Sequence, residues 1–246
     1  MNRLIDADPM QHIHTITLDL DDTLWPIGPV IARAEQTLWG YLKDNYPRIA
    51  ATWDSSKSAA LRNAVIAEHP ERSHDLRFLR RTVLARMAAS CDYEPSMVDA
   101  AFAVFDEQRN NVELFPDAEA GLTRLRKHYR LVALTNGNAS LEKIGIRHLF
   151  DDVVTAVDAG AAKPAPQIFS LACARAGADP HEVLHVGDHP ELDVDGARAA
   201  GMRTAWINRK GESWPAVLPN PDATVTDLLK LADWLQPFAT NRKAER

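Results

Sequence analysis

A short stretch near the N-terminus, from His14 to Leu24, reads HTITLDLDDTL. It joins a run of β-branched and aliphatic residues to three acids, Asp19, Asp21 and Asp22. Such an apolar run is typical of a strand that helices cover on both faces of a parallel sheet. In an open α/β sheet, ligands bind beyond the carboxyl ends of the strands. We therefore expect this strand to carry its acids to the edge where chemistry takes place.

The chain from Pro116 onward alternates helix-like and strand-like segments. Further strands are predicted at 131–134, 152–156, 183–186 and 204–207, with Val225 in a last strand. Helices are predicted at 117–128, 139–145, 164–177, 192–201 and 227–236, before a mobile polar tail at 239–246. Strands that alternate with helices favour an α/β fold built on a parallel sheet.

The block from Val30 to about Asn110 shows helical periodicity and little strand signal. Apolar residues recur at helical spacing through it, at 31–42, 61–66, 76–87 and 98–105. Pro and Gly residues at 25–29 predict a linker in front of it. We expect one core of residues 1–28 and 111–246, with residues 29–110 inserted as an all-helical domain.

Composition limits the classes of function. The formal net charge is −6 and no long basic run occurs, which argues against a generic nucleic-acid surface. No apolar run is long enough to cross a bilayer, so we expect no membrane partner. The first residues carry acids where a signal peptide would need an apolar segment, so a cytoplasmic location is expected. The two cysteines, Cys91 and Cys173, suggest no disulfide framework.

Polar residues stand at the ends of three predicted strands, and a lysine stands before a predicted helix. They are Asp19 and Asp21, Thr135 and Asn136, Asp188, and Lys163. Parallel strands bring such ends to one edge of the sheet. Carboxylates, a hydroxyl, an amide and an ammonium suit a divalent hard cation together with a phosphoryl group.

Four segments resemble, in order, the motifs of the haloacid dehalogenase-like (HAD) superfamily. They are Asp19-Leu20-Asp21-Asp22-Thr23, Thr135-Asn136-Gly137, Lys163-Pro164, and Gly187-Asp188 with Asp193. The resemblance spans residues 14 to 207 and implies a Rossmann-like parallel sheet flanked by helices. It also implies that the helical insert is a C1-type cap domain, which closes over the active site and selects the substrate.

The resemblance implies two catalytic acids. Asp19 would attack phosphorus and form an aspartyl-phosphate, a known covalent route for carboxylates. Asp21 would protonate the leaving oxygen and then deprotonate the hydrolytic water. The carboxylates of Asp19 and Asp188 and the backbone carbonyl of Asp21 would hold Mg²⁺.

The remaining motif residues would bind phosphate or support those that do. Thr135, the backbone N–H of Asn136 and Lys163 would neutralise the phosphoryl oxygens. Asp193 would orient Lys163 or a metal-bound water.

The acid at Asp21 argues for phosphate chemistry, because dehalogenases of the superfamily lack it. Segments such as ALTNGNA and VLHVGDHPELDVDGARAAGM also resemble bacterial flavin mononucleotide phosphatases. Those enzymes also act on 5-amino-6-(5-phospho-D-ribitylamino)uracil in riboflavin biosynthesis. We predict a Mg²⁺-dependent phosphomonoester hydrolase for a small phosphorylated metabolite, with FMN or a ribityl phosphate as candidates. A sugar phosphomutase and a non-catalytic binding protein on the same fold remain alternatives.

Other polar residues are predicted to have structural or solvated roles. Asp22 and Asp195 fit none of the catalytic roles, and His185 is expected to pack in the core because it lies inside a strand. In the helical block, His74-Asp75 resembles a metal-binding pair but has no partner pair, and a substrate contact is the alternative. The arginines of the following helix are expected on a solvated face, with a contact to an anionic group of the substrate as the alternative.

Overall fold

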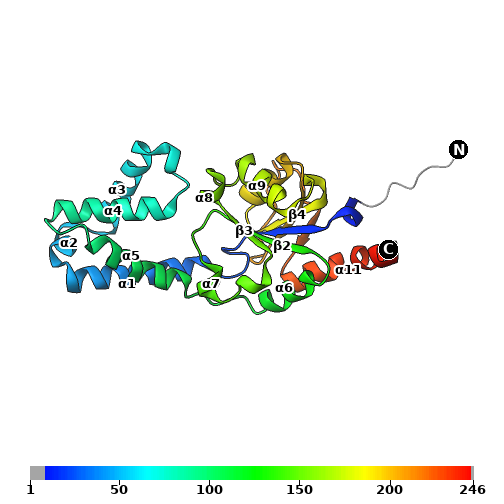
Figure 1. Ribbon diagram of the computed structural model, residues 1–246, viewed down its shortest axis with the longest axis horizontal. Coiled ribbons are helices and arrows are strands. Elements are labelled where there is room, and N and C mark those ends of the chain that lie inside the picture. Colours follow the sequence, from blue (N-terminus) through cyan, green and yellow to red (C-terminus); the bar gives the residue numbers. More distant parts are fainter. Residues whose placement is uncertain (1–8, 245–246) are drawn as a thin grey trace. The chain divides into compact units, whose positions relative to one another are not determined.

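The computed structural model describes residues 9–244. These residues form a six-stranded parallel sheet in the order β3-β2-β1-β4-β5-β6 (Figure 1). The strands are β1 (Thr15–Leu18), β2 (Arg130–Thr135), β3 (Asp152–Thr155), β4 (Val183–Gly187), β5 (Arg203–Ile207) and β6 (Ala223–Val225). The predicted α/β fold with a Rossmann-like parallel sheet is confirmed.

Strand register brings the ends of the central strands to one level. Leu18 of β1 is the partner of Ala133 in β2 and of Val186 in β4. The N–H of Asp19 donates to the Val186 carbonyl at 2.9 Å, which continues the ladder by one residue. The polar residues that follow these strands therefore begin at the same edge of the sheet.

Helices cover both faces of the sheet. They are α6 (Ala118–Arg126), α8 (Ala156–Ala159), α9 (Pro166–Ala176), α10 (Gly196–Ala199) and α11 (Leu228–Ala244). Figure 1 shows α9 on one side and α6 with α11 on the other. Ile168 and Phe169 of α9 pack on Val132 and Leu134 of β2, and all four side chains are fully buried.

A second set of helices forms its own compact unit with its own core. They are α1 (Ile27–Asn45), α2 (Pro47–Thr52), α3 (Ser55–Glu68), α4 (Leu76–Ser90), α5 (Met97–Asn110) and α7 (Leu141–Ile144). The core of this helical unit includes Leu42, Leu79, Met87, Phe102 and Phe105. Cys91 of this unit, like Cys173 of α9, is a buried free thiol.

The compact units divide the chain differently from the predicted limits. The helical unit takes residues 26–113 and also 137–145, which the sequence analysis placed in the sheet domain. That second piece contains α7, and it is bonded to α5. The N–H of Ser140 donates to the Asn110 side chain at 2.7 Å, and the Lys143 ammonium pairs with Asp106.

Several predicted elements need correction. Residues 25–29 are no linker, because α1 begins at Ile27; Pro29 lies in its first turn, where a missing N–H breaks no helical bond. Helix α2, with Pro47 at its start, was not predicted. Residues 192–201 form a π-helical turn, Pro190–Asp195, followed by the short α10, rather than one helix.

The prediction of a mobile tail at 239–246 is also wrong for most of these residues. Helix α11 continues through Pro237 to Ala244, and the last two residues lie outside the described part of the chain. Leu231, Leu235 and Ala239 are buried at helical spacing on both sides of the proline. Packing of this apolar face therefore maintains the helix past Pro237, where the proline by itself predicts its end.

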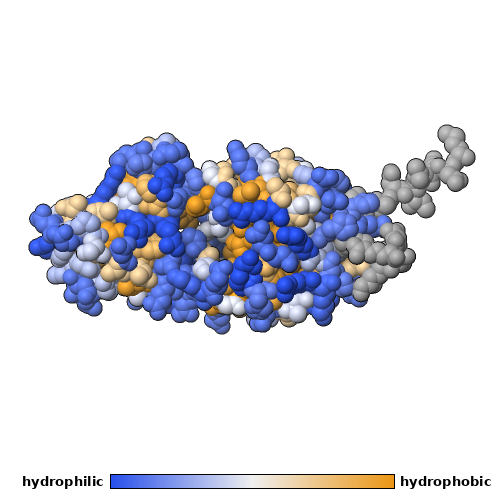
Figure 2. Space-filling view, in the orientation of Figure 1, coloured by the Kyte–Doolittle hydropathy of each residue, from blue (hydrophilic) through white to orange (hydrophobic). Residues whose placement is uncertain are grey.

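Polar side chains of the helical unit are largely paired within it. Asp75 caps α4 by accepting from the Phe78 N–H at 2.8 Å. The arginines of α4 form ion pairs: Arg77 with Asp106, Arg80 with Glu35, and Arg81 with Asp99. Hydrophilic residues dominate the face shown in Figure 2. Among the described residues, no helix combines the length and the apolar character that a membrane crossing requires.

Candidate active site

The first acids lie at the end of β1 and in the tight turn that follows it. The Leu24 N–H donates to the Leu20 carbonyl at 2.7 Å, which closes the turn. Asp22 has a φ of +60°, a left-handed conformation that aspartate tolerates better than most residues. Asp19 therefore stays at the strand end, and Asp21 projects from the turn.

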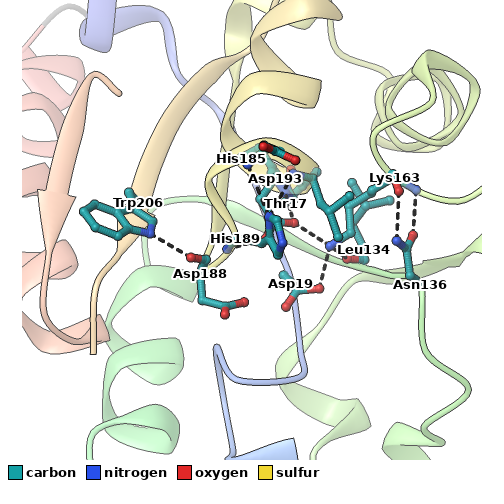
Figure 3. Close-up of polar contacts among 12 residues, drawn as sticks. Thr17, Asp19, Leu134, Asn136, Lys163, His185, Asp188, His189, Asp193 and Trp206 are labelled. Atoms are coloured by element: carbon teal, nitrogen blue, oxygen red, sulfur yellow. Dashed lines mark hydrogen bonds and ion pairs between the residues drawn. The ribbon is translucent and has the colours of Figure 1, made fainter. Parts of the chain in front are cut away.

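Lys163 occupies the centre of the site (Figure 3). Its ammonium donates to Asp19 Oδ1 at 2.5 Å, to Asp193 Oδ1 at 2.6 Å and to the Leu134 carbonyl at 3.1 Å. An ammonium has three donors, and these acceptors use all of them. The first and third motifs, far apart in the sequence, thus meet in one buried ion pair.

The Asn136 side chain holds the backbone of Lys163. Its Oδ1 accepts from the Lys163 N–H at 2.6 Å, and its Nδ2 donates to the Lys163 carbonyl at 3.1 Å. The peptide bond from Lys163 to Pro164 is cis. The amide of Asn136 therefore fixes the lysine, a role that the sequence analysis did not assign to this side chain.

Asp193 accepts bonds on both of its oxygens. Oδ1 accepts from Lys163 and lies 3.2 Å from His185 Nε2, while Oδ2 accepts from the His189 N–H at 3.0 Å. A Cβ on Gly187 would clash with this carboxyl group, so the close approach of Asp193 requires glycine there. These contacts place the Asp193 carboxylate beside the Lys163 ammonium.

His185 is a fully buried link behind the site. Its Nδ1 lies 2.8 Å from Thr17 Oγ1. Burial lowers the pKa of His185, against the opposing effect of Asp193. In the neutral ring, Nε2 donates to the Asp193 carboxylate, which can only accept, and Nδ1 accepts from the Thr17 hydroxyl. His185 is thus buried as predicted, and it also supports Asp193.

Burial and the excess of acids change the pKa values of the carboxyl groups. Burial raises the pKa of Asp19 to about 8 although Lys163 acts to lower it. Burial, together with Asp193 and Asp22, raises the pKa of Asp188 to about 7. Burial also acts on Asp193, but Lys163 and His185 outweigh it and hold its pKa well below the usual range.

This donor set suits a divalent cation. Oxygens of Asp19, Asp188 and Asp193 lie within 4.8 Å of one another, with one ammonium among three carboxylates. The backbone of Asp188 is held by Trp206 Nε1, which donates to its carbonyl at 2.7 Å. Asp19 and Asp188 offer the carboxylates best placed for a metal ion, because both oxygens of Asp193 already accept protein donors.

Asp21 has a partner that the sequence analysis did not consider. Trp25 Nε1 donates to Asp21 Oδ1 at 2.9 Å, and the Trp25 side chain is fully buried. Asp21 does not belong to the group of closely spaced carboxylates found among the described residues.

The four motifs thus converge on one edge of the sheet, and comparison with known proteins gives the family. A model of the haloacid dehalogenase-like hydrolase family matches residues 13–201. The chain belongs to this family. The predicted superfamily and the predicted hydrolase class are confirmed.

Relatives of this HAD-family chain include named phosphatases. The 5-amino-6-(5-phospho-D-ribitylamino)uracil phosphatase YigB of Escherichia coli is 32% identical over 203 residues, which cover 81% of this chain and 85% of that protein. The glyceraldehyde 3-phosphate phosphatase of Methanopyrus kandleri is 32% identical over 210 residues, covering 80% and 84%. A solved structure titled 2-haloacid dehalogenase, from Pseudomonas syringae pv. Tomato, is 35% identical with a TM-score of 0.88, covering 92% of this chain and 100% of that one.

Besides the role of the Asn136 amide, sequence reasoning missed two supports of the HAD motifs that lie outside the motifs themselves. His185 and Thr17 are register partners on β4 and β1. The sequence shows a polar residue inside each of two apolar strands, but the pairing appears only with the register. Trp25 gave a weaker signal, because a tryptophan next to a proline fits a linker as well as a buried anchor.

Proposed function

We propose that this HAD-family chain is a Mg²⁺-dependent phosphomonoester hydrolase that works through an aspartyl-phosphate. The observation that carries the proposal is the buried Lys163–Asp19 pair at the end of β1, with Asp21 two residues further on. The named phosphatases among its relatives support the same reaction.

In the first step, a carboxylate oxygen of Asp19 bonds to phosphorus while the bond from phosphorus to the ester oxygen breaks. Asp21 gives its proton to that leaving oxygen. In the second step, Asp21 takes a proton from a water that attacks phosphorus. The Asp19 carboxylate is regenerated and inorganic phosphate leaves.

The other motif residues would balance charge during both steps. When bound at Asp19, Asp188 and the Asp21 carbonyl, Mg²⁺ would offset the repulsion between the anionic nucleophile and the anionic phosphate. Thr135 and the Asn136 N–H would donate to the phosphoryl oxygens. Lys163 would do the same by exchanging one of its three present acceptors for phosphate.

A dehalogenase is the second candidate, because the solved relative with 35% identity carries that name. A halide leaves as a stable anion and needs no proton from an acid. This chain has Asp21 at the position of the acid, and a buried tryptophan hydrogen-bonds it. The presence of this acid favours phosphate esters over haloacids.

For the substrate, we propose FMN or a ribityl phosphate of riboflavin biosynthesis. The support is the 32% identity to YigB over most of both chains and the matching core segments. The helical unit is the proposed cap, and its residues would select the substrate. We also propose a cytoplasmic location for this reaction.

A release assay tests these proposals. The protein is incubated with flavin, ribityl, sugar and nucleotide phosphates, and separately with 2-chloropropionate, each with Mg²⁺ or with EDTA. We expect Mg²⁺-dependent release of phosphate, highest for the flavin or ribityl ester, and no chloride. Release of chloride alone would assign the chain to the dehalogenases. Isomerised sugar phosphate without free phosphate would indicate a mutase.

A further inference from the structure

Trp25 is buried directly against the proposed acid–base residue. None of its side chain is exposed, and its single polar atom, Nε1, donates to Asp21 Oδ1 at 2.9 Å. A buried indole N–H needs an acceptor, and tryptophan usually finds one. Here the acceptor is a carboxylate that the proposed reaction uses.

The backbone of the turn holds both ends of this contact. Asp21 and Trp25 form a β-bridge, and the Asp22 N–H donates to the Trp25 carbonyl at 2.8 Å. The Leu24 carbonyl, next to the tryptophan, accepts from the Phe115 N–H at 2.9 Å. These backbone contacts therefore hold the indole in place, so its N–H can restrain the Asp21 carboxyl group.

An indole N–H is a donor only, and it does not titrate at neutral pH. By donating to Oδ1 it restrains the orientation of the carboxyl group without exchanging a proton with it. A general acid must reach the leaving oxygen within hydrogen-bond distance, and small displacements reduce the rate strongly. A fixed carboxyl plane satisfies this requirement before the substrate arrives.

We propose that Trp25 is a positioning residue for Asp21, holding the carboxyl group in the orientation from which it exchanges protons with the leaving group and the water. The inference rests on the proposed phosphatase function and adds to it a specific role for a residue outside the four motifs. Trp25 itself touches no reacting atom in this scheme.

The positioning role of Trp25 is tested with two phosphate esters whose leaving groups differ in acidity. In Trp25→Phe, an aromatic ring remains but the N–H is lost. The first phosphoryl transfer is measured as kcat/KM for an alkyl phosphate, whose alkoxide must be protonated, and for 2,4-dinitrophenyl phosphate, whose leaving group needs no proton. We expect about a tenfold loss or more for the alkyl ester and less than about a threefold loss for the activated ester.

Two further variants sharpen this comparison. Asp21→Asn should show the same selective loss, and adding Trp25→Phe to it should cause no further selective loss, because both act through one group. The matched control is Trp53→Phe in the helical unit, where Nε1 donates to Ser90 Oγ at 2.9 Å. It should leave the ratio of the two esters unchanged.

The outcomes separate the inference from the function on which it rests. Wild-type protein that releases phosphate from neither ester contradicts the proposed phosphatase. Wild-type activity combined with an equal loss on both esters in Trp25→Phe contradicts the positioning role alone. Circular dichroism and thermal melting verify folding, and Trp25→Leu, which also lacks the N–H, replaces Trp25→Phe if that variant does not fold. An equal loss on both esters in Trp25→Leu would equally overturn the role.

Discussion

The ammonium of Lys163 lies 2.5 Å from a carboxylate oxygen of Asp19, and both side chains are almost completely buried. The same ammonium also contacts Asp193 at 2.6 Å. One cation therefore balances two carboxylates in a region that water scarcely reaches. Removal of one member of such a group leaves charge uncompensated in the interior, which destabilises a protein more than the loss of a surface pair does.

Lys163→Met should lower the free energy of unfolding by about 3–5 kcal/mol, because it leaves Asp19 and Asp193 buried without their cation. Urea denaturation followed by circular dichroism measures the change. Lys230→Met, at an exposed position of α11, is the matched control and should change stability by less than about 0.5 kcal/mol. Equal effects of the two substitutions would contradict the central position of Lys163.

Asp19→Asn should lower kcat at least about a thousandfold, because an amide oxygen is a poor nucleophile towards phosphorus. The fold should remain, since the amide keeps the shape of the side chain. Phosphate release measures turnover, and acid quenching of the wild type should trap phosphate bound to protein. Asp195→Asn, which changes an acid outside the proposed machinery, should keep wild-type turnover. Residual activity of Asp19→Asn near the wild-type level would exclude Asp19 as the nucleophile.

The thermal stability of the metal-free protein should fall between about pH 5 and pH 8. In the folded chain the pKa of Asp188 is about 7 and that of Asp19 about 8, against 3.8 as the ordinary value. Across this window the unfolded chain has released protons that the folded chain keeps, so rising pH favours unfolding. Asp193, whose pKa is lowered, acts in the opposite sense, and only in acid below the ordinary value.

Mg²⁺ should raise the Tm more at pH 8 than at pH 6, because the cation competes with protons for the same carboxylates. Scanning calorimetry with Mg²⁺ or EDTA at both values measures the difference. Asp188→Asn removes a proposed ligand and should remove most of the stabilisation by Mg²⁺. A Tm gain that is the same at both pH values would show that the ion binds elsewhere.

His185→Leu should reduce both stability and turnover, because it removes the donor to Asp193 and the acceptor of the Thr17 hydroxyl. We expect a loss of about 2–4 kcal/mol, the sum of two buried polar groups left without this partner. His185→Gln can again donate to Asp193 and should recover part of the loss. Urea denaturation measures the free energy of unfolding of each variant, and phosphate release measures its kcat. If His185→Leu is as stable and as active as the wild type, His185 is a packing residue alone.

Features that depend on local sequence alone could be predicted. The placement of Asp19 and Asp188 at one edge followed from the rule that the ends of parallel strands meet there. The helical content of the inserted block followed from the spacing of its apolar residues. Features that depend on register or packing could not. The Thr17–His185 bond requires the alignment of β1 with β4, and the Trp25–Asp21 bond requires the turn to close. The continuation of α11 past Pro237 depends on the buried face that this helix packs into the core.

The attachment of α7 to α5 limits how helical units can be exchanged between relatives. A chimera that transplants residues 26–113 alone would separate Asp106 from Lys143 and the Asn110 side chain from the Ser140 N–H. The foreign unit would then meet a host α7 selected for a different partner. A transplant that keeps residues 114–136 of the host sheet domain needs four junctions, at 25/26, 113/114, 136/137 and 145/146, so that both pieces of the helical unit move together. With only two junctions, at 25/26 and 145/146, the transplanted fragment also replaces β2, the neighbour of β1 in the sheet.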